Sequence, residues 1–162
     1  MRDFWLGLDK IHYLNAVARL QQLNMVINLG SDLNSYTFVY TGVVVGGADT
    51  NYSLSYTDVT VVTNDTNPDG RFLNCFSGNG PVPFSTPDAD HDRDLNLNCA
   101  AEAGAGWWFS QCDPNPECNP LGLHYVTGNE AVTPKRMRFN GVEMQKHAYD
   151  FTLFRMYFSD PY

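Results

Sequence analysis

Four cysteines constrain the fold of this chain more than any other feature, because all of them lie in one window between residues 75 and 118. They are Cys75, Cys99, Cys112 and Cys118. The window is dense in Pro, Gly, Asn and Asp, and an even number of cysteines in such a loop-rich segment indicates two disulfides. A zinc site is the weaker alternative, since the chain has no CxxC pair and its histidines lack zinc-ligand spacing.

The same window contains aspartates at alternate positions: Asp88, Asp90, Asp92 and Asp94. Neighbouring carboxylates repel one another unless a cation lies among them, and a set of oxygen ligands suits a hard ion such as Ca²⁺. An EF-hand loop is excluded, because Arg93 stands where that loop needs Gly. A solvated acidic turn remains the alternative, and the spacing alone does not decide between the two.

Length and charge restrict the function. At 162 residues the chain is about one domain long, and its net charge of −8 argues against nucleic acid as a partner. No apolar run reaches the roughly 18 residues of a membrane span, so we expect no membrane insertion. Sequons at Asn51 and Asn64 predict N-glycosylation and, with the disulfides, a secreted protein. The N-terminus shows no signal-peptide pattern, so we expect a missing leader or a piece of a larger or oligomeric secreted protein.

Apolar patterning predicts a short helix, several strands and a long irregular segment. Asp9 to Leu14 reads as a helix with Asp9 as its N-cap. Alternation of apolar and polar residues predicts strands at 20–29, 35–45, 52–56, 59–62 and 151–158, with a hairpin turn at 30–34. From residue 63 to about 128 we expect no regular structure, and a segment of that length is usually cross-linked or functional.

Several motifs, taken together and in this order, resemble the C-terminal fibrinogen-related domain of fibrinogen chains, ficolins, tachylectins, angiopoietins and tenascins. No single piece is specific, but the combination is hard to reach by chance. The pieces are Phe4-Trp-Leu-Gly-Leu-Asp-Lys-Ile-His-Tyr-Leu14, Phe84-Ser-Thr86, the alternating aspartates, Asn98-Cys99-Ala100, Gly106-Trp107-Trp108-Phe109 and Cys112.

The resemblance implies an α+β fold: a central twisted antiparallel sheet with short helices, and a loop-rich lobe that binds calcium and ligand. We expect one domain over 1–162, with the sheet region at 1–62 and 140–160 and the lobe at 63–139. We also expect this domain to lack the family's first subdomain, which precedes the Phe4 motif. The resemblance further implies a Cys99–Cys112 disulfide. Cys75 and Cys118 have no family counterpart, and a second disulfide within the lobe is the expected outcome.

The resemblance favours calcium over the solvated turn. It implies that the side chains of Asp90 and Asp92 bind Ca²⁺, and we expect the backbone carbonyls of Asp94 and Asn96 to complete the protein ligands. Trp107 and Trp108 are either core or a platform for sugar stacking, and the core is the commoner role of adjacent aromatics.

In lectin-like members of the family, a pocket beside the calcium receives acetyl groups, next to a cis peptide bond that here would be Gln111-Cys112. Asp113 stands where the family has His, and Ala103 where it has an aromatic residue, so we expect weak or absent binding of simple N-acetylated sugars. Arg138, Phe139 and Tyr149 are candidates for a different pocket wall. An arginine there would suit an anionic ligand, although a solvated basic strand edge is the commoner meaning of such residues.

Two functions follow from these features. The first is a calcium-dependent recognition module, lectin-like, that binds carbohydrate or acetylated and anionic surface groups in innate immunity or adhesion. The second is a module that binds an extracellular protein within a larger assembly. We expect no enzymatic activity, since HExxH, GxSxG and phosphate-loop motifs are missing, and His12 within the first helix favours a structural role.

Overall fold

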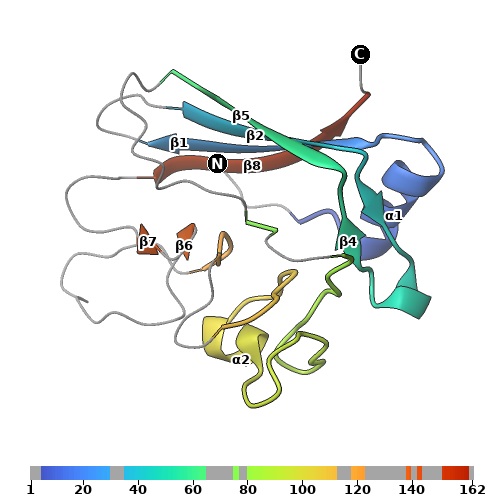
Figure 1. Cartoon of the computed structure of the whole chain (residues 1–162), viewed down its shortest axis with the longest axis vertical. Helices are drawn as coiled ribbons and strands as arrows, with labels where there is room; N and C mark the ends of the chain where they lie inside the picture. Colours follow the sequence, from blue (N-terminus) through green and yellow to red (C-terminus); the bar gives the residue numbers. More distant parts are fainter. Residues whose placement is uncertain are drawn as a thin grey trace.

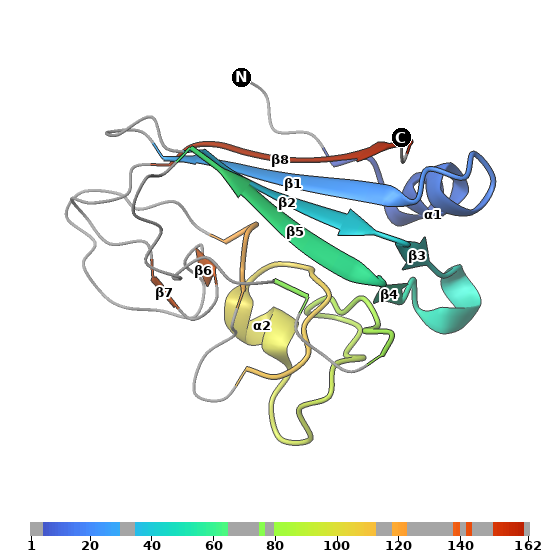
Figure 2. The ribbon, with the colours of Figure 1, turned by 45° about the horizontal axis from the view of Figure 1, so that its top comes forward.

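The computed structural model describes residues 5–29, 35–64, 75–76, 80–112, 118–122, 138–139, 142–143 and 151–160. Its main element is an antiparallel sheet with the strand order β5-β2-β1-β8. The strands are β1 (Gln22–Leu29), β2 (Ser35–Thr41), β5 (Asp58–Thr63) and β8 (Phe151–Ser159). Figures 1 and 2 show the twisted sheet, with the loop-rich lobe on one side of it. The expected α+β fold is confirmed.

The period of two in the sequence decides which face of the sheet is buried. In β2, the side chains of Tyr36, Phe38 and Tyr40 are buried while their neighbours are only half-buried. These three pair with Ile27, Met25 and Leu23 of β1, which are at most 1% exposed. β8 joins the other side of β1, so the last strand of the chain lies beside the first, with a register shift at Asn28 and Leu29. Its inward residues Phe154, Met156 and Phe158 pack against the same core.

The sequence-based strand boundaries need two corrections. The segment 35–45 is not one strand, because β2 ends at Thr41 and β3 (Val44–Val45) pairs with β4 (Leu54–Ser55) in a separate small sheet. Gly42 causes the break: its φ is +60°, and a Cβ there would collide with Thr57 Oγ1, so the chain turns where only glycine fits. Only Leu54 and Ser55 of the expected strand at 52–56 belong to a strand. The turn at 30–34 lies outside the described residues.

Helix α1 (Leu8–Ala16) covers the residues expected to be helical, but Asp9 is not its N-cap. That position is Gly7, and the Asp9 carboxylate instead accepts a hydrogen bond of 2.6 Å from Tyr52 Oη. Asn15, which is 4% exposed, fixes the helix to β3: its Nδ2 donates to Val43 O at 2.8 Å and its Oδ1 accepts from Val45 N at 2.7 Å. His12 Nδ1 lies 2.8 Å from Val45 O, which agrees with the structural role expected for it.

The segment from residue 63 to 128 is not wholly irregular, which corrects the expectation. It contains helix α2 (Cys99–Ala103), and the 3-10 helix η1 (Ala48–Thr50) lies earlier in the chain. Asn98 caps α2 by accepting from Ala101 N at 2.8 Å, and Gly104 ends the helix in the left-handed region. Two further short strands, β6 (Arg138–Phe139) and β7 (Val142–Glu143), pair with each other. Among the described residues, no helix is long and apolar enough to cross a membrane.

An aromatic cluster joins the lobe to the sheet. Phe76 stacks on Trp107 with ring centroids 5.4 Å apart and meets Tyr40 of β2 edge-on at 4.9 Å. Trp108 packs edge-on against Trp107 at 5.2 Å and against Phe84 at 4.9 Å. Aromatic pairs in such offset or edge-on arrangements add about 0.5–1.5 kcal/mol each beyond the area that they bury. Ring packing therefore connects the lobe to the core face of the sheet.

Candidate functional site

Hydrogen bonds fix the backbone at the start of the acidic loop and within it. Ser85 exchanges two backbone hydrogen bonds with Trp107, of 3.0 and 3.1 Å, and its side chain accepts a third, of 3.0 Å, from His91 N. His91 Nδ1 lies 3.0 Å from Phe84 O. Arg93 N also donates to Ser110 O at 2.9 Å, which ties the loop to the strand-like segment after Trp107. These hydrogen bonds therefore fix the backbone that carries the aspartates of the loop.

Three of the four alternating aspartates each accept a hydrogen bond from the backbone N–H two residues later. Asp90 Oδ1 accepts from Asp92 N at 3.3 Å, Asp92 Oδ1 from Asp94 N at 2.8 Å, and Asp94 Oδ1 from Asn96 N at 3.1 Å. Such Asx turns curl the backbone and explain the alternate spacing of the aspartates in local terms. The spacing that suggested a metal site is thus also what the loop conformation requires.

Asp92 is the best anchored of these carboxylates. Its second oxygen accepts a hydrogen bond of 2.8 Å from Cys99 N, the first residue of α2. Burial raises the pKa of Asp92, and the adjacent Asp90 carboxylate raises it further, whereas the backbone N–H groups of Cys99 and Asp94 lower it. A partly buried carboxylate beside another negative group is a position that a cation would stabilise.

Asp88 does not take part in this arrangement. It is exposed, and its Oδ1 accepts a hydrogen bond of 2.7 Å from Thr86 Oγ1. That hydrogen bond lowers the pKa of Asp88 below its ordinary value. Asp90 and Asp92 are therefore neighbouring aspartates that interact in the loop, and their binding of calcium stays a prediction. Asp88 provides a natural control.

Asp94 has a contact that sequence reasoning missed. Its Oδ2 lies 3.5 Å from Cys112 N and 3.7 Å from Cys112 Sγ. Asp94, Cys99 and Cys112 place ligand-type atoms within 4.8 Å of one another, but both sulfurs are bonded in a disulfide and are not metal ligands. The Asp94 carboxylate thus faces the disulfide. The carbonyls of Asp94 and Asn96 stay predicted calcium ligands.

Two disulfides cross-link the lobe. Cys75 is bonded to Cys118 and Cys99 to Cys112, with Cα atoms 5.3 and 5.4 Å apart, and no described cysteine is free. These are the two pairs expected from the sequence, which excludes the zinc alternative for these cysteines. All four cysteines belong to the buried core cluster.

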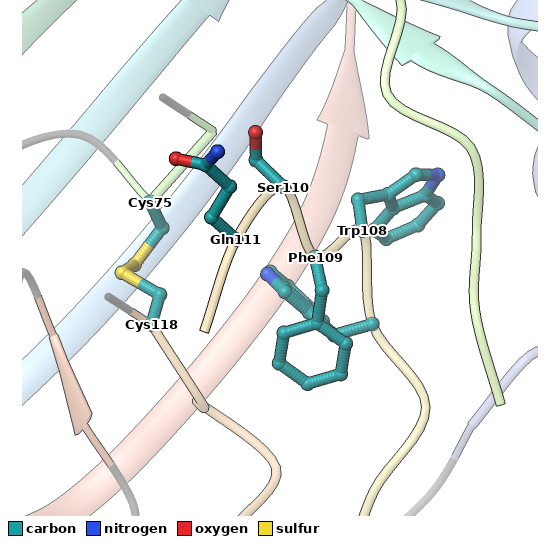
Figure 3. Close-up of a pocket in the computed structure, with 7 residues that line it drawn as sticks. Cys75, Trp108, Phe109, Ser110, Gln111 and Cys118 are labelled. Atoms are coloured by element: carbon teal, nitrogen blue, oxygen red, sulfur yellow. A yellow bond between two sulfur atoms is a disulfide. The ribbon is translucent and has the colours of Figure 1, made fainter. Parts of the chain in front are cut away.

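A shallow hollow lies beside the Cys75–Cys118 disulfide, with a cavity volume of about 10 Å³, roughly the room for one water molecule. Figure 3 shows Gln111 and Ser110 on the side nearer the disulfide and Trp108 on the far side. Trp107 and Trp108 both line it, yet they are only 1% and 2% exposed. Because their faces are buried in ring contacts, the expectation that they form core is confirmed and the sugar-stacking alternative is wrong.

The remaining predicted ligand residues are described less fully. Gln111 is exposed at the hollow, and Cys112 is buried next to it. Arg138 and Phe139 form β6, of which the backbone pairing alone is described. Asp113 and Tyr149 lie outside the described residues.

Both sequon asparagines belong to the described part of the chain. Asn51 is exposed and ends η1 with a φ of 51°, in the left-handed region that Asn tolerates well. Asn64 follows β5, and its Oδ1 accepts a hydrogen bond of 2.7 Å from Ser35 N. The side-chain nitrogen that would carry a glycan takes no part in that hydrogen bond.

Sequence comparisons extend the match to known proteins. The chain is 28% identical over 127 residues to the fibrinogen gamma chain of Xenopus laevis, an alignment that covers 68% of this chain and 26% of that one. It is 32% identical over 124 residues to ryncolin-4 of Cerberus rynchops, covering 76% and 32%. The chain therefore spans about a quarter to a third of the length of these curated relatives.

Solved structures with the same fold include the fibrinogen-like globe domain of human ANGPTL6, with a TM-score of 0.69 and 21% identity over 99% of this chain and 65% of that one. The lamprey fibrin D-dimer, complexed with the peptide Gly-His-Arg-Pro-amide, matches with a TM-score of 0.64 and 21% identity over 95% of this chain and 49% of that one. The family model for the C-terminal globular domain of fibrinogen beta and gamma chains matches residues 1–156, and the chain belongs to this family.

Proposed function

We propose that this chain is a secreted recognition module whose ligand-binding lobe is organised by a calcium ion held between Asp90 and Asp92. The observation that carries the proposal is the pair itself: two backbone N–H groups hold Asp92, and burial, together with the neighbouring Asp90 carboxylate, raises its pKa. A divalent cation would stabilise the ionised form of Asp92.

The donor set fits a hard cation. Each oxygen of Asp92 accepts one backbone hydrogen bond and keeps a lone pair for a metal, and Asp90 is exposed and accepts only a long bond of 3.3 Å. With the carbonyls of Asp94 and Asn96, the loop would supply four oxygen ligands, and water would fill the rest of the about 6–8 positions that calcium prefers. When bound, calcium would supply positive charge that offsets the repulsion between the two carboxylates.

The covalent structure connects this loop to the proposed ligand site. Asp92 holds the N–H of Cys99, Cys99 is bonded to Cys112, and Cys112 follows Gln111 at the hollow. Asp94 reaches Cys112 from the other side. Because few rotatable bonds separate the aspartates from Gln111, a change in the loop on metal release would change the wall of the hollow.

For the ligand we propose a carbohydrate or an acetylated or anionic surface group, in innate immunity or adhesion. Gln111, Cys112, Asp113, Arg138, Phe139 and Tyr149 are the residues proposed to contact it. Arg138 would select an anionic group, since a guanidinium matches the geometry of a carboxylate or sulfate. Two disulfides and two sequons support an extracellular location.

A second candidate is binding of an extracellular protein segment without sugar recognition. It is favoured by the structural match to a fibrin fragment in complex with a short peptide. The two candidates share the calcium loop and differ only in the ligand class.

Binding to a glycan array, measured with calcium and again with a chelator, tests the proposal. We expect glycan binding that the chelator abolishes, that Asp92→Ala lacks, and that Asp88→Ala retains, because Asp88 is turned toward Thr86. Arg138→Ala should weaken the binding of sialylated or sulfated glycans more than that of N-acetylglucosamine. Calcium-dependent capture of a protein ligand with no glycan signal would favour the second candidate, and calcium-independent binding would contradict both.

A further inference from the structure

Among the described strands, β5 forms an edge of the main sheet, and its own residues lack the lysine, proline or bulge that often protects an edge. It pairs with β2 on one side, and among the described residues no strand pairs with its other side (Figure 2). Its register with β2 is regular from Asp58 to Thr63, without a bulge. Natural edge strands are commonly blocked by lysine, proline or bulges, and the sequence DVTVVT has none of these.

The exposed side chains of β5 are apolar or β-branched. Val61 is 44% exposed and Val62 is 58% exposed, although the two point to opposite faces of the sheet. Val61 pairs with Phe38 on the core face, and Val62 pairs with Thr37 on the outer face. Apolar side chains on both faces of an open edge fit an added strand, whose side chains would cover them.

The residue pattern of β5 matches an antiparallel copy of itself. A two-fold axis perpendicular to the sheet and passing at Val61 pairs Val61 with its own copy, Thr60 with Val62, and Val59 with Thr63. All of these pairs are β-branched, and cross-strand pairs of this kind stabilise a sheet. Asp58, the one charged residue of the strand, would lie opposite the neutral Asn64 of the other copy.

Charge selects this arrangement over the alternatives. In the antiparallel pair, the two Asp58 residues lie six positions apart along the strand, which is about 20 Å at roughly 3.4 Å per residue. This exceeds the screening length of about 10 Å at 0.1 M salt. A parallel pair would place the two carboxylates side by side, and an axis at Thr60 would place Asp58 against Val62.

We propose that two copies of this chain associate through β5, which joins their sheets into one continuous antiparallel sheet. An axis perpendicular to the sheet leaves both lobes on the same side, because each lobe lies on the core face of its sheet (Figure 1). The dimer would thus present two ligand sites to one surface, which increases avidity without any new contact at either site. The dimer does not depend on the calcium or ligand assignments.

The sequon at Asn64 adds a condition to this dimer. Asn64 directly follows β5, and its Oδ1 holds the start of β2 through Ser35 N. A glycan on its nitrogen would stand next to Asp58 of the other copy and oppose pairing. The experiment therefore uses the full chain with Thr66→Ala, which removes this sequon and leaves Asn64 in place.

Sedimentation equilibrium over a wide concentration range measures the dimer. We expect a reversible dimer, and we expect Val61→Lys and Val61→Glu each to raise its dissociation constant by tenfold or more, because like charges would meet at the axis. An equimolar mixture of these two variants should restore the wild-type dissociation constant, since Lys then faces Glu. Val44→Lys is the matched control: Val44 is 54% exposed on β3, which pairs with β4 in a separate sheet, and this substitution should leave the dimer unchanged.

Thermal melts of each variant check folding, and Val62→Lys repeats the test from the outer face. A monomer at every concentration, an equal effect of Val61→Lys and Val44→Lys, or a failure of the mixture to restore the dimer would each overturn the proposal.

Discussion

Replacing Asp90 with asparagine separates the charge of the acidic loop from its conformation. Asp90 accepts only the 3.3 Å hydrogen bond from Asp92 N, and an asparagine side chain keeps an oxygen for that bond. The substitution removes the negative charge that helps to raise the pKa of Asp92. In the absence of calcium, we therefore expect stability to stay constant or to rise by about 0.2–1 kcal/mol, the range for exposed charge pairs.

With calcium bound, the wild-type protein should be more stable than Asp90→Asn. An ion present at about 100 times its dissociation constant stabilises the native state by roughly 2.7 kcal/mol. For a chain of this size, 1 kcal/mol corresponds to about 2–4 °C in Tm, so the wild-type shift should be about 5–10 °C. The substituted asparagine would offer only a neutral ligand, and even a tenfold loss of affinity removes about 1.4 kcal/mol. The shift of the variant should thus be about half that of the wild type, or smaller.

Differential scanning calorimetry in chelator and at graded calcium concentrations checks both expectations. Asp88→Asn is the control, since Asp88 accepts its hydrogen bond from Thr86 rather than from the loop backbone. It should keep the full calcium shift. If Asp90→Asn shifted with calcium as far as the wild type, or if Asp88→Asn lost the shift equally, the assignment of Asp90 as a ligand would be refuted.

Three more predictions concern stability. Replacing Cys75 and Cys118 by Ser should lower the free energy of unfolding by about 4 kcal/mol, and replacing Cys99 and Cys112 by about 3 kcal/mol. The difference comes from loop entropy, since the paired cysteines are 43 and 13 residues apart. Denaturant titration of both variants tests this order, and a larger loss for the Cys99–Cys112 pair would contradict it. The pKa of Asp92 is raised in the folded state, so without calcium this group destabilises the protein above that pKa, and the destabilisation is lost as pH falls through it. In chelator, the Tm of Asp90→Asn should therefore exceed that of the wild type by less as the pH is lowered. A difference in Tm that grows on acidification would contradict this explanation. Trp107→Ala should cost about 3–5 kcal/mol, because the ring is 1% exposed and stacked on Phe76, whereas Trp5→Ala, at 42% exposed, should cost much less; thermal melts of the two variants check this, and equal losses would contradict it.

Local patterns predicted the sheet well. Alternation in Tyr36, Phe38 and Tyr40 reports which face is buried, because successive side chains of any strand point to opposite faces. The strand at 151–158 was also predictable within one residue. The place of that strand beside β1 was not derivable from its own residues, since pairing between distant segments depends on the whole sheet.

The sequence failed where two local rules compete. Asp9 satisfies the preference for an acidic residue at a helix start, yet the N-cap of α1 is Gly7. The Asp9 carboxylate instead accepts a hydrogen bond from Tyr52, which only folding brings near. Helix α2 was missed because five residues carry too little periodicity, although Asn98 and Gly104 are good cap signals.

For the candidate site, the sequence by itself determined the acidic run and the even cysteine count in one loop-rich window. The family resemblance added the Cys99–Cys112 pair and the choice of Asp90 and Asp92, which stay predicted calcium ligands. The tertiary structure decided that Asp94 faces Cys112, which lies 18 residues further along the chain. It also decided that both tryptophans of the lobe are core. The physical reason is that residue type and spacing specify which groups can bind a cation or pack. Which of them do so depends on hydrogen bonds and ring contacts with segments distant in the chain, and these form only when the lobe closes on the sheet.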